Sequence, residues 1–389
     1  ISELARFWMD KGKPEEAERL HREVLAMRRS ARGQNPPEVG RTLRDLASVL
    51  SSQGKYAEAE KLQRDAIALH ERAYGGEHEE IASDLEGLQS ILRARGQIEP
   101  AIAAARRCLD MRVKVLGTDH LDTATAMNNL AILLYEKWDL AEAERLYREV
   151  LAFDLRRLGQ VHPNTATVTN NLAFVLRDRG QYEEAERLYR SVLDLDRRLF
   201  GAEHPYVATV MNNLATLLVA RGRLDEAEGL YRDSLAMFRR VYGEEHWRVG
   251  AVLGGLATVL SARGDANAEG MYRAALATLE AALPPQHPTI EPVLLGLGRY
   301  LTHRGRASEA EPLLRRAVTS RMARLGERDP RTAEAQLRLG VSLAALGRTS
   351  DARLMLEAAQ GRLRDEPHYK ADAREAERVL ATLTKSARR

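Results

Sequence analysis

The chain has 389 residues, of which 44% are hydrophobic and 30% are charged, and its formal net charge is only +3. No apolar run reaches the roughly 18 residues that a membrane-spanning helix needs, so no membrane is expected as a partner. The small net charge gives no electrostatic reason to expect nucleic acid, and the single cysteine, Cys108, excludes a disulfide framework and fits a reducing, cytoplasmic compartment.

One alanine recurs along the whole chain at a nearly constant interval. The step is 42 residues throughout, except for one step of 41 residues. A period of this length is typical of a solenoid built from one repeated unit. The recurring alanines are Ala17, Ala59, Ala101, Ala143, Ala185, Ala227, Ala268, Ala310 and Ala352.

Each repeat has the pattern of two helices separated by a turn. In eight of the nine repeats a glycine stands four or five residues before the alanine, and glycine is the residue that most often ends a helix. Trp138 takes this place in the fourth repeat and requires either a different turn or local strain. Apolar residues at helical spacing precede and follow the turn, as Leu172 and Leu176 precede Gly180 and Val192 follows it. The sequence therefore predicts an all-α chain of nine helix pairs, and we interpret the recurring alanine as lying one turn into each second helix, where that helix crosses the first.

A second series of residues indicates where each first helix begins. Asparagine and aspartate are preferred N-cap residues, and proline is favoured at the first helical position. We therefore expect the histidines of this series to be N-caps. A shared metal is excluded because adjacent repeats lie about 10 Å apart, whereas zinc ligands must each lie about 2 Å from the ion. The series is Asn35-Pro36, His78, His120, His162-Pro163, His204-Pro205, His246, His287-Pro288 and Asp329-Pro330.

The two ends of the array differ from its middle. Residues 1–10 hold only the last part of a first helix and would leave Leu4, Phe7 and Trp8 uncovered. This suggests the hypothesis that the chain is the C-terminal part of a longer protein, cut inside a repeat. A charged helix at about Tyr369 to Leu383 suits the polar outer face of a cap. We expect residues 1–366 to form nine repeats, the first truncated, and residues 367–389 to form a capping helix and tail.

The repeats resemble tetratricopeptide repeats, and their 42-residue length resembles the kinesin light chain group in its bacterial form. The motif Asn-Asn-Leu-Ala stands at 128–131, 170–173 and 212–215, with Gly-Gln-Tyr-Glu-Glu-Ala-Glu from Gly180 and Phe-Gly-Ala-Glu-His-Pro from Phe200. The resemblance implies a right-handed superhelical solenoid of antiparallel helix pairs. The outer repeats have Arg44-Asp45, Glu86-Gly87, Gly254-Gly255 and Leu295-Gly296 in place of the paired asparagines. Kinesin transport is not implied, because no motor-binding heptad segment is present.

Sequence motifs for catalysis are absent. There is no Gly-x-x-x-x-Gly-Lys-Ser/Thr loop for phosphates, no His-Glu-x-x-His zinc pair and no Gly-x-Ser-x-Gly elbow. The repeated Glu-Ala-Glu segments begin the second helices, where the helix dipole favours negative charge. Cys108 follows Arg106 and Arg107 but has no histidine at helical spacing, so we interpret it as a packed residue. We therefore expect a protein that is not an enzyme and needs no cofactor or metal.

The resemblance also implies that the first helices line a concave groove. Asparagine side chains offer a donor and an acceptor to the backbone of an extended peptide, and arginines would favour acidic side chains. Alternatively, the second asparagine of each pair (Asn129, Asn171 and Asn213) ties adjacent helices together. The candidate peptide-binding residues are Asn128, Asn170, Asn212, Arg41, Arg44, Arg93, Arg177 and Tyr135, with Ser48, Thr125, Thr167 and Thr216 at further groove positions.

The leading interpretation is a non-catalytic protein-interaction scaffold that binds an extended, acidic peptide segment in this groove. The alternative is the C-terminal sensor or regulatory region of a larger bacterial signalling protein, such as a Ser/Thr kinase or NTPase, that binds its own upstream domain. RNA binding is disfavoured, because base-reading helical repeats need a stacking residue in every repeat and aromatic residues make up only 5% of the chain.

Overall fold

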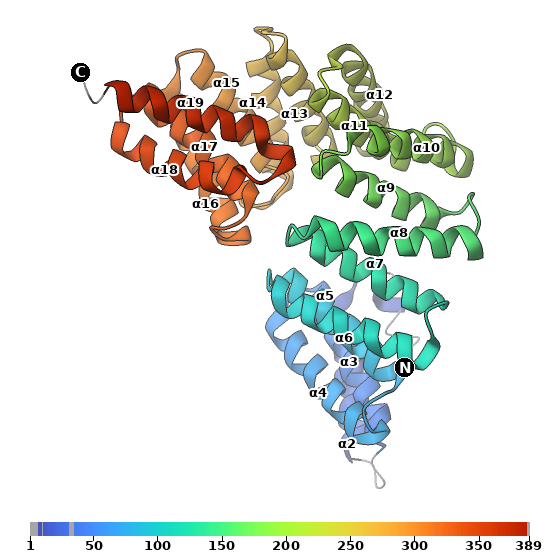
Figure 1. Cartoon of the computed structure of the whole chain (residues 1–389). Helices are drawn as coiled ribbons and strands as arrows, with labels where there is room; N and C mark the ends of the chain where they lie inside the picture. The colour runs from blue at the N-terminus through green and yellow to red at the C-terminus, as the bar shows by residue number, and fades with distance from the viewer. Residues whose placement is uncertain (1–6, 10, 31–34, 387–389) are drawn as a thin grey trace. The chain divides into compact units, whose positions relative to one another are not determined.

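The computed structural model describes residues 7–9, 11–30 and 35–386, which contain helices and no strand (Figure 1). The chain divides into two compact units, Ile1–Arg157 and Leu158–Arg389. The first contains α2 (Pro14–Ser30), α3 (Pro36–Ser52), α4 (Tyr56–Tyr74), α5 (Glu79–Ala94), α6 (Ile98–Leu116), α7 (Leu121–Glu136) and α8 (Leu140–Arg157).

The second unit continues the same alternation of helices. It contains α9 (Pro163–Asp178), α10 (Tyr182–Phe200), α11 (Pro205–Ala220), α12 (Leu224–Tyr242), α13 (Trp247–Ala262), α14 (Ala268–Ala282), α15 (Glu291–His303), α16 (Ala307–Leu325), α17 (Pro330–Ala345), α18 (Thr349–Leu363), the short 3-10 helix η1 (Pro367–Tyr369) and α19 (Lys370–Ser386). The prediction of an all-α solenoid of helix pairs is confirmed.

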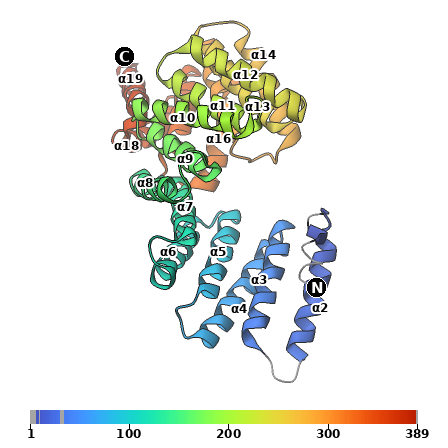
Figure 2. The same ribbon diagram turned by 90° about the vertical axis from the view of Figure 1, so that its right-hand side faces the viewer.

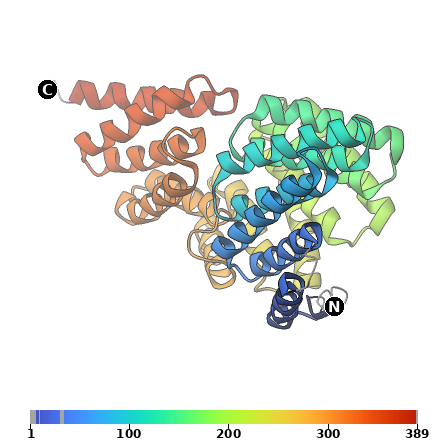
Figure 3. The same ribbon diagram turned by 90° about the horizontal axis from the view of Figure 1, so that it is seen from below.

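Within each unit, every helix packs against the helices before and after it in the chain. Figure 2 shows this for the first unit, where α2 to α6 lie side by side in chain order. In the second unit, first helices of neighbouring repeats also contact each other, from α9 and α11 through to α15 and α17. The last helix, α19, packs against α17 and α18 and is drawn in red in Figure 3. The first helices of this unit therefore share one face.

The histidine series caps the first helices, as the sequence predicts. His78, His120, His162, His204 and His246 are N-caps, and each Nδ1 accepts a hydrogen bond from the backbone N–H two residues later. Asp329 caps α17 in the same way, whereas the Asn35 side chain makes no capping bond.

The prediction for His287-Pro288 is wrong. There α15 begins only at Glu291, and Ile290 is its N-cap. The Nδ1 of His287 accepts from the N–H of Thr289, at 3.3 Å, but inside a turn that precedes the helix.

Trp138 adopts the same turn as the glycines that it replaces. Its φ is 69°, close to the 75° of Gly180, and no other non-glycine residue among those described has a positive φ. A side chain in this left-handed region costs about 1–2 kcal/mol. Of the two alternatives that the sequence leaves open, the structure therefore selects the unchanged turn with local strain.

The recurring alanines are fully buried, and all nine have no exposed surface. Ala185 is the fourth residue of α10, one turn into the second helix as expected. Ala268 differs, because α14 begins at this residue. The turn before α14 is one residue shorter than in the other repeats, because Gly264 stands only four residues before Ala268.

The glutamate that follows the alanine joins neighbouring repeats. The carboxylate of Glu186 accepts hydrogen bonds from Arg190 of its own helix, from Arg221 at 2.5 Å and from Arg223 at 2.7 Å. Arg221 and Arg223 belong to the turn of the next repeat. Burial alone would raise the pKa of Glu186, but Arg190 and Arg223 outweigh burial and lower it. The same link recurs at Glu18, Glu60, Glu228, Glu269 and Glu311.

Two glycines that replace paired asparagines make room for tyrosines. A Cβ atom on Gly255 would lie 2.5 Å from the ring of Tyr231, and one on Gly296 would lie 2.6 Å from the ring of Tyr272. The Tyr272 hydroxyl donates to Thr258 Oγ1 at 3.0 Å. A side chain at either glycine would therefore displace the tyrosine ring from the position that it holds in these repeats.

A buried ion pair joins three helices of the first unit. His70 Nδ1 lies 2.5 Å from Asp84 Oδ2, and His70 Nε2 lies 3.0 Å from the carbonyl oxygen of Pro37. Both ring nitrogens therefore face acceptors, an arrangement that favours the protonated imidazolium. Burial alone would lower the pKa of His70, but these two hydrogen bonds outweigh burial and raise it.

Replacing Ala185 by leucine should lower the melting temperature. The added atoms would enter a fully buried crossing, and overpacking of this kind costs about 1–3 kcal/mol. Ala274→Leu, at an exposed position of α14, is the matched control. An Ala185→Leu melt that coincides with that of the control would contradict the crossing-point interpretation.

The stability of the chain should fall at alkaline pH through His70. Because the folded pKa lies above the unfolded value of about 6.5, the contribution is complete below that value and is lost as pH rises through the folded pKa. Urea titrations between about pH 6 and pH 9 should show a smaller loss for His70→Gln than for the unchanged chain. Equal slopes for the two proteins would contradict the prediction.

Candidate functional site

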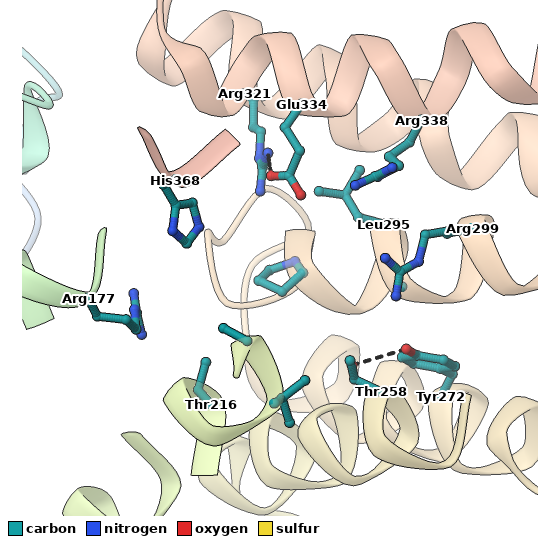
Figure 4. A pocket seen from close by; sticks show the side chains of 14 residues that line it. Arg177, Thr216, Thr258, Tyr272, Leu295, Arg299, Arg321, Glu334, Arg338 and His368 are labelled. Atoms are coloured by element: carbon teal, nitrogen blue, oxygen red, sulfur yellow. Dashed lines mark hydrogen bonds and ion pairs between the residues drawn. The ribbon is translucent and has the colours of Figure 1, made fainter. Parts of the chain in front are cut away.

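A pocket of about 420 Å³ opens in the second unit (Figure 4). Its walls carry four arginines and one glutamate, together with hydroxyl and apolar groups. The lining residues are Arg177, Thr216, Val219, Ala220, Thr258, Tyr272, Pro292, Leu295, Gly296, Arg299, Arg321, Glu334, Arg338 and His368.

The repeat architecture positions this pocket on the shared face of the first helices. The helices α9, α11, α13, α15 and α17 contribute in turn Arg177, Thr216, Thr258, Arg299 and Arg338. Each helix occupies the equivalent place in its repeat, so side chains distant in the sequence converge.

The segment before α19 forms one further wall of the pocket. His368 belongs to η1, and Figure 4 shows its ring beside the pocket. Pro367 lies next to the turn after α9, because a Cβ on Gly180 would be 3.8 Å from the Cβ of Pro367. The C-terminal segment thus returns to the first repeat of the second unit.

Two of the four arginines are held in buried ion pairs. Arg321 lies 2.9 Å from Glu334 and 3.2 Å from Glu291. Arg338 pairs with Asp372 and Glu375 of α19 and so fastens that helix to α17. Both arginines are less than a tenth exposed.

The electrostatics of Glu334 follow from these pairs. Burial alone would raise its pKa, but the charges of Arg321 and Arg338 outweigh burial and lower it. The ionised Glu334 therefore adds to the carboxylates that neutralise Arg321 and Arg338, and Arg299 is left as the pocket arginine without a carboxylate partner among the described residues.

The other two arginines of the pocket differ in their partners. Arg177 stacks on the ring of Phe174, 4.0 Å from its centroid, and lies 2.7 Å from Asp178. Arg299 has no ion-pair partner in the described part of the chain. His368 Nδ1 is buried and likewise has no hydrogen-bond partner there. An anionic group in the pocket would provide acceptors for these donors.

The other arginines predicted for the groove lie in the first unit and are paired. Arg41 Nε donates to Glu80 at 2.7 Å, and Arg44 Nη1 donates to the same carboxylate at 2.8 Å. Arg93 pairs with Glu136. These ion pairs connect neighbouring first helices. A role for these arginines in peptide binding stays a prediction.

The predicted asparagines fall into different environments. Asn128 lies in the first unit, where its Oδ1 is buried without a partner among the described atoms, and Tyr135 lies on the same helix. Asn170 and Asn212 lie on α9 and α11, and Asn170 Oδ1 accepts a hydrogen bond from Asn213 at 3.1 Å. Whether any of the three binds a peptide stays untested.

The structural alternative for the second asparagine of each pair is confirmed at two positions. Asn213 Nδ2 reaches the preceding repeat at Asn170, and Asn129 Nδ2 donates to Glu86, also in the preceding repeat, at 3.0 Å.

Sequence reasoning missed Arg299, Arg321, Arg338 and His368. A signal exists for two of them. Arg299 stands two residues after Leu297, the position that Thr216 holds after Leu214. Arg338 stands where other repeats have the second asparagine of the pair. The other two come from a second helix and from η1, where no repeat register marks the pocket.

The cysteine of the described part of the chain is buried and packed. Cys108 is buried, donates to the carbonyl oxygen of Ala82 at 3.2 Å, and has its pKa raised by burial to about 11. In the same part of the chain, no group of three His, Cys, Asp or Glu side chains is arranged to hold a metal ion. None of the described helices has the length and apolar character to cross a membrane.

The architecture and the shared groove face define a helix-pair repeat protein. The profile of the tetratricopeptide repeat family matches residues 1–72, 38–114, 90–156, 164–240, 218–284 and 289–365. The chain belongs to the tetratricopeptide repeat family, as its sequence predicts. No curated protein matches the sequence.

Solved structures similar to this chain include proteins described as kinesin light chains. One, with nearly identical repeats, is from Podosopora anserina (23% identity, 54% of this chain and 99% of that one, TM-score 0.49). Another is BtubC (BKLC) from P. vanneervenii (26% identity, 58% and 91%, TM-score 0.46). The apo form of the quorum sensor NprR from B. thuringiensis shares the fold over 91% of this chain and 97% of its own, at 14% identity and a TM-score of 0.59.

The paired and unpaired arginines of the pocket should differ in their effect on stability. Arg338→Ala should lower the melting temperature, because it leaves Asp372 without its partner and loosens α19, and breaking a buried ion pair costs about 3–5 kcal/mol. Arg299→Ala should leave the melt nearly unchanged. Thermal unfolding followed by circular dichroism measures both, and equal losses for the two variants would contradict this division.

Proposed function

We propose that the chain is a non-catalytic interaction module whose second unit binds an extended, acidic protein segment across its first helices. The observation that carries the proposal is that Arg299 lines the pocket without a carboxylate partner among the described residues, whereas the other three arginines there are paired.

The shape of the pocket suits an extended protein segment better than a small molecule. Its lining comes from five first helices and so follows the repeat direction. An extended strand advances about 3.3 Å per residue, so about three residues of a ligand would span the roughly 10 Å between adjacent repeats. Family membership agrees with this proposal at the level of protein–protein interaction.

The source of the acidic segment distinguishes two versions of this function. A segment from a separate protein would make the chain an adaptor. A segment of the same polypeptide would make it a regulatory region of a larger signalling protein. Reading the gene upstream of the codon for Ile1 for kinase or NTPase motifs separates the two versions.

A peptide array of acidic, neutral and basic sequences should show preferential binding of acidic peptides. Arg299→Ala should then lower the affinity for the best acidic peptide roughly tenfold or more, because a hydrogen bond to a charged group contributes about 1.5–3 kcal/mol. Fluorescence anisotropy with the labelled peptide gives the dissociation constants.

The matched control is Arg187→Ala, which removes an exposed arginine of α10 outside the pocket. It should leave the affinity within about twofold. Basic peptides that bind as tightly as acidic ones, or an Arg299→Ala protein that binds like the control, would refute the proposal.

A further inference from the structure

A second pocket of the second unit is lined by α9 and α11, two of the helices that also line the arginine-lined pocket. Its volume is about 370 Å³. Asn170 of α9 and Thr209 of α11 line it, and Arg177 and Thr216, seven residues further along each helix, line the first pocket. Seven residues make two helical turns, or about 10 Å. The two pockets therefore open on the same face of both helices.

Asp196 is the unusual group in this second pocket. The residue is only 4% exposed, and its side chain has no hydrogen bond or ion pair among the described residues. Burial raises the pKa of Asp196 to about 6. Because an unpaired buried carboxylate costs stability, its place at the wall of an open pocket indicates that a partner arrives from outside.

The remaining lining offers hydrogen-bond acceptors and no cation. The hydroxyls of Thr167 and Thr209 donate to carbonyl oxygens of their own helices at 3.0 Å, so their lone pairs stay available to a ligand. Asn164 and Asn170 add amide groups. No arginine, lysine or histidine lines the pocket, which comprises Pro163, Asn164, Ala166, Thr167, Asn170, Val192, Asp196, Phe200, Tyr206, Thr209 and Val210.

Two aromatic rings complete this environment. Phe200 and Tyr206 meet edge to face with their centroids 5.1 Å apart, and Tyr206 is 57% exposed. Aromatic faces attract ammonium and guanidinium groups, and the apolar Val192 and Val210 suit the methylene stem of a long basic side chain.

We propose that the Asp196 pocket binds a lysine or arginine side chain of the segment whose acidic part occupies the arginine-lined pocket. This inference rests on the proposed function and adds a rule for the ligand. Along α9 and α11 the two pockets are about 10 Å apart, which about three residues of an extended strand span, so the basic residue is expected three or more positions from the acidic residue that meets Arg299.

The test uses one acidic core peptide, the best binder of the array. A lysine is placed one to six positions from the core on either side, and each peptide has a twin with acetyl-lysine. Affinities are measured by fluorescence anisotropy. We expect lysine three or more positions from the core, on one side only, to tighten binding roughly tenfold, and the neutral acetyl-lysine twin to match the core alone.

Asp196→Asn should abolish the gain from lysine and leave the affinity for the core unchanged. The matched control is Asp194→Asn, because the exposed Asp194 lies on the same helix and carries the same charge. The Asp194→Asn protein should keep the full increase in affinity that lysine gives. Thermal melts check folding, and Asp196→Asn should melt no lower than the unchanged chain, because Asp196 has no partner to lose.

The outcomes separate this inference from the proposed function. If the core binds through Arg299 but lysine changes the affinity less than twofold at every position, the cation pocket is refuted and the proposed function stands. If the core alone does not bind, the proposed function fails. Lysine peptides that then bind the unchanged chain but not Asp196→Asn would still support the cation pocket, and their failure to bind would refute it.

Discussion

The architecture depends on the close approach of two helices at one fully buried alanine in each repeat. We expect a larger side chain at this position to force the two helices apart, at a cost of about 1–3 kcal/mol. The next residue then determines how the pair joins its neighbour. In six of the nine pairs this residue is a glutamate that binds a cation from the following repeat, as Glu186 does with Arg221 and Arg223. Helix packing and the inter-repeat link thus occupy adjacent positions, which explains why the Ala-Glu dipeptide recurs.

The sequence is sufficient where structure is decided locally. Helix caps, turns and periodic apolar positions act over a few residues, so the histidine caps and the glycine turns follow from the pattern, whereas the sequence left two alternatives open at Trp138. The two errors, at His287 and Ala268, lie on either side of α14, where the repeat is one residue short. A register argument transfers from one repeat to the next only while the spacing is conserved.

The candidate site was harder to predict because its chemistry depends on pairing between repeats. In the sequence, Arg44 and Arg299 are both arginines of a first helix at groove positions. In the structure Arg44 is neutralised by Glu80, 36 residues later, whereas Arg299 has no such partner among the described residues. One repeat cannot reveal this difference, because the decisive residue belongs to its neighbour.

One position of the second helices shows how this array varies its inner surface. It is held by Arg28, His70, Arg112, Asp154, Asp196, Phe238, Leu279, Arg321 and Leu363, and from His70 onward each of these residues is buried.

Where this position is polar, a neighbouring helix usually supplies a partner. His70 binds Asp84, Arg112 binds Glu86 and Arg321 binds Glu291. Asp196 has a charge but no partner within the described chain. A scaffold optimised only for stability would fill this place with an apolar residue, as it does at Phe238 and Leu279, so the unpaired carboxylate is best explained by a ligand.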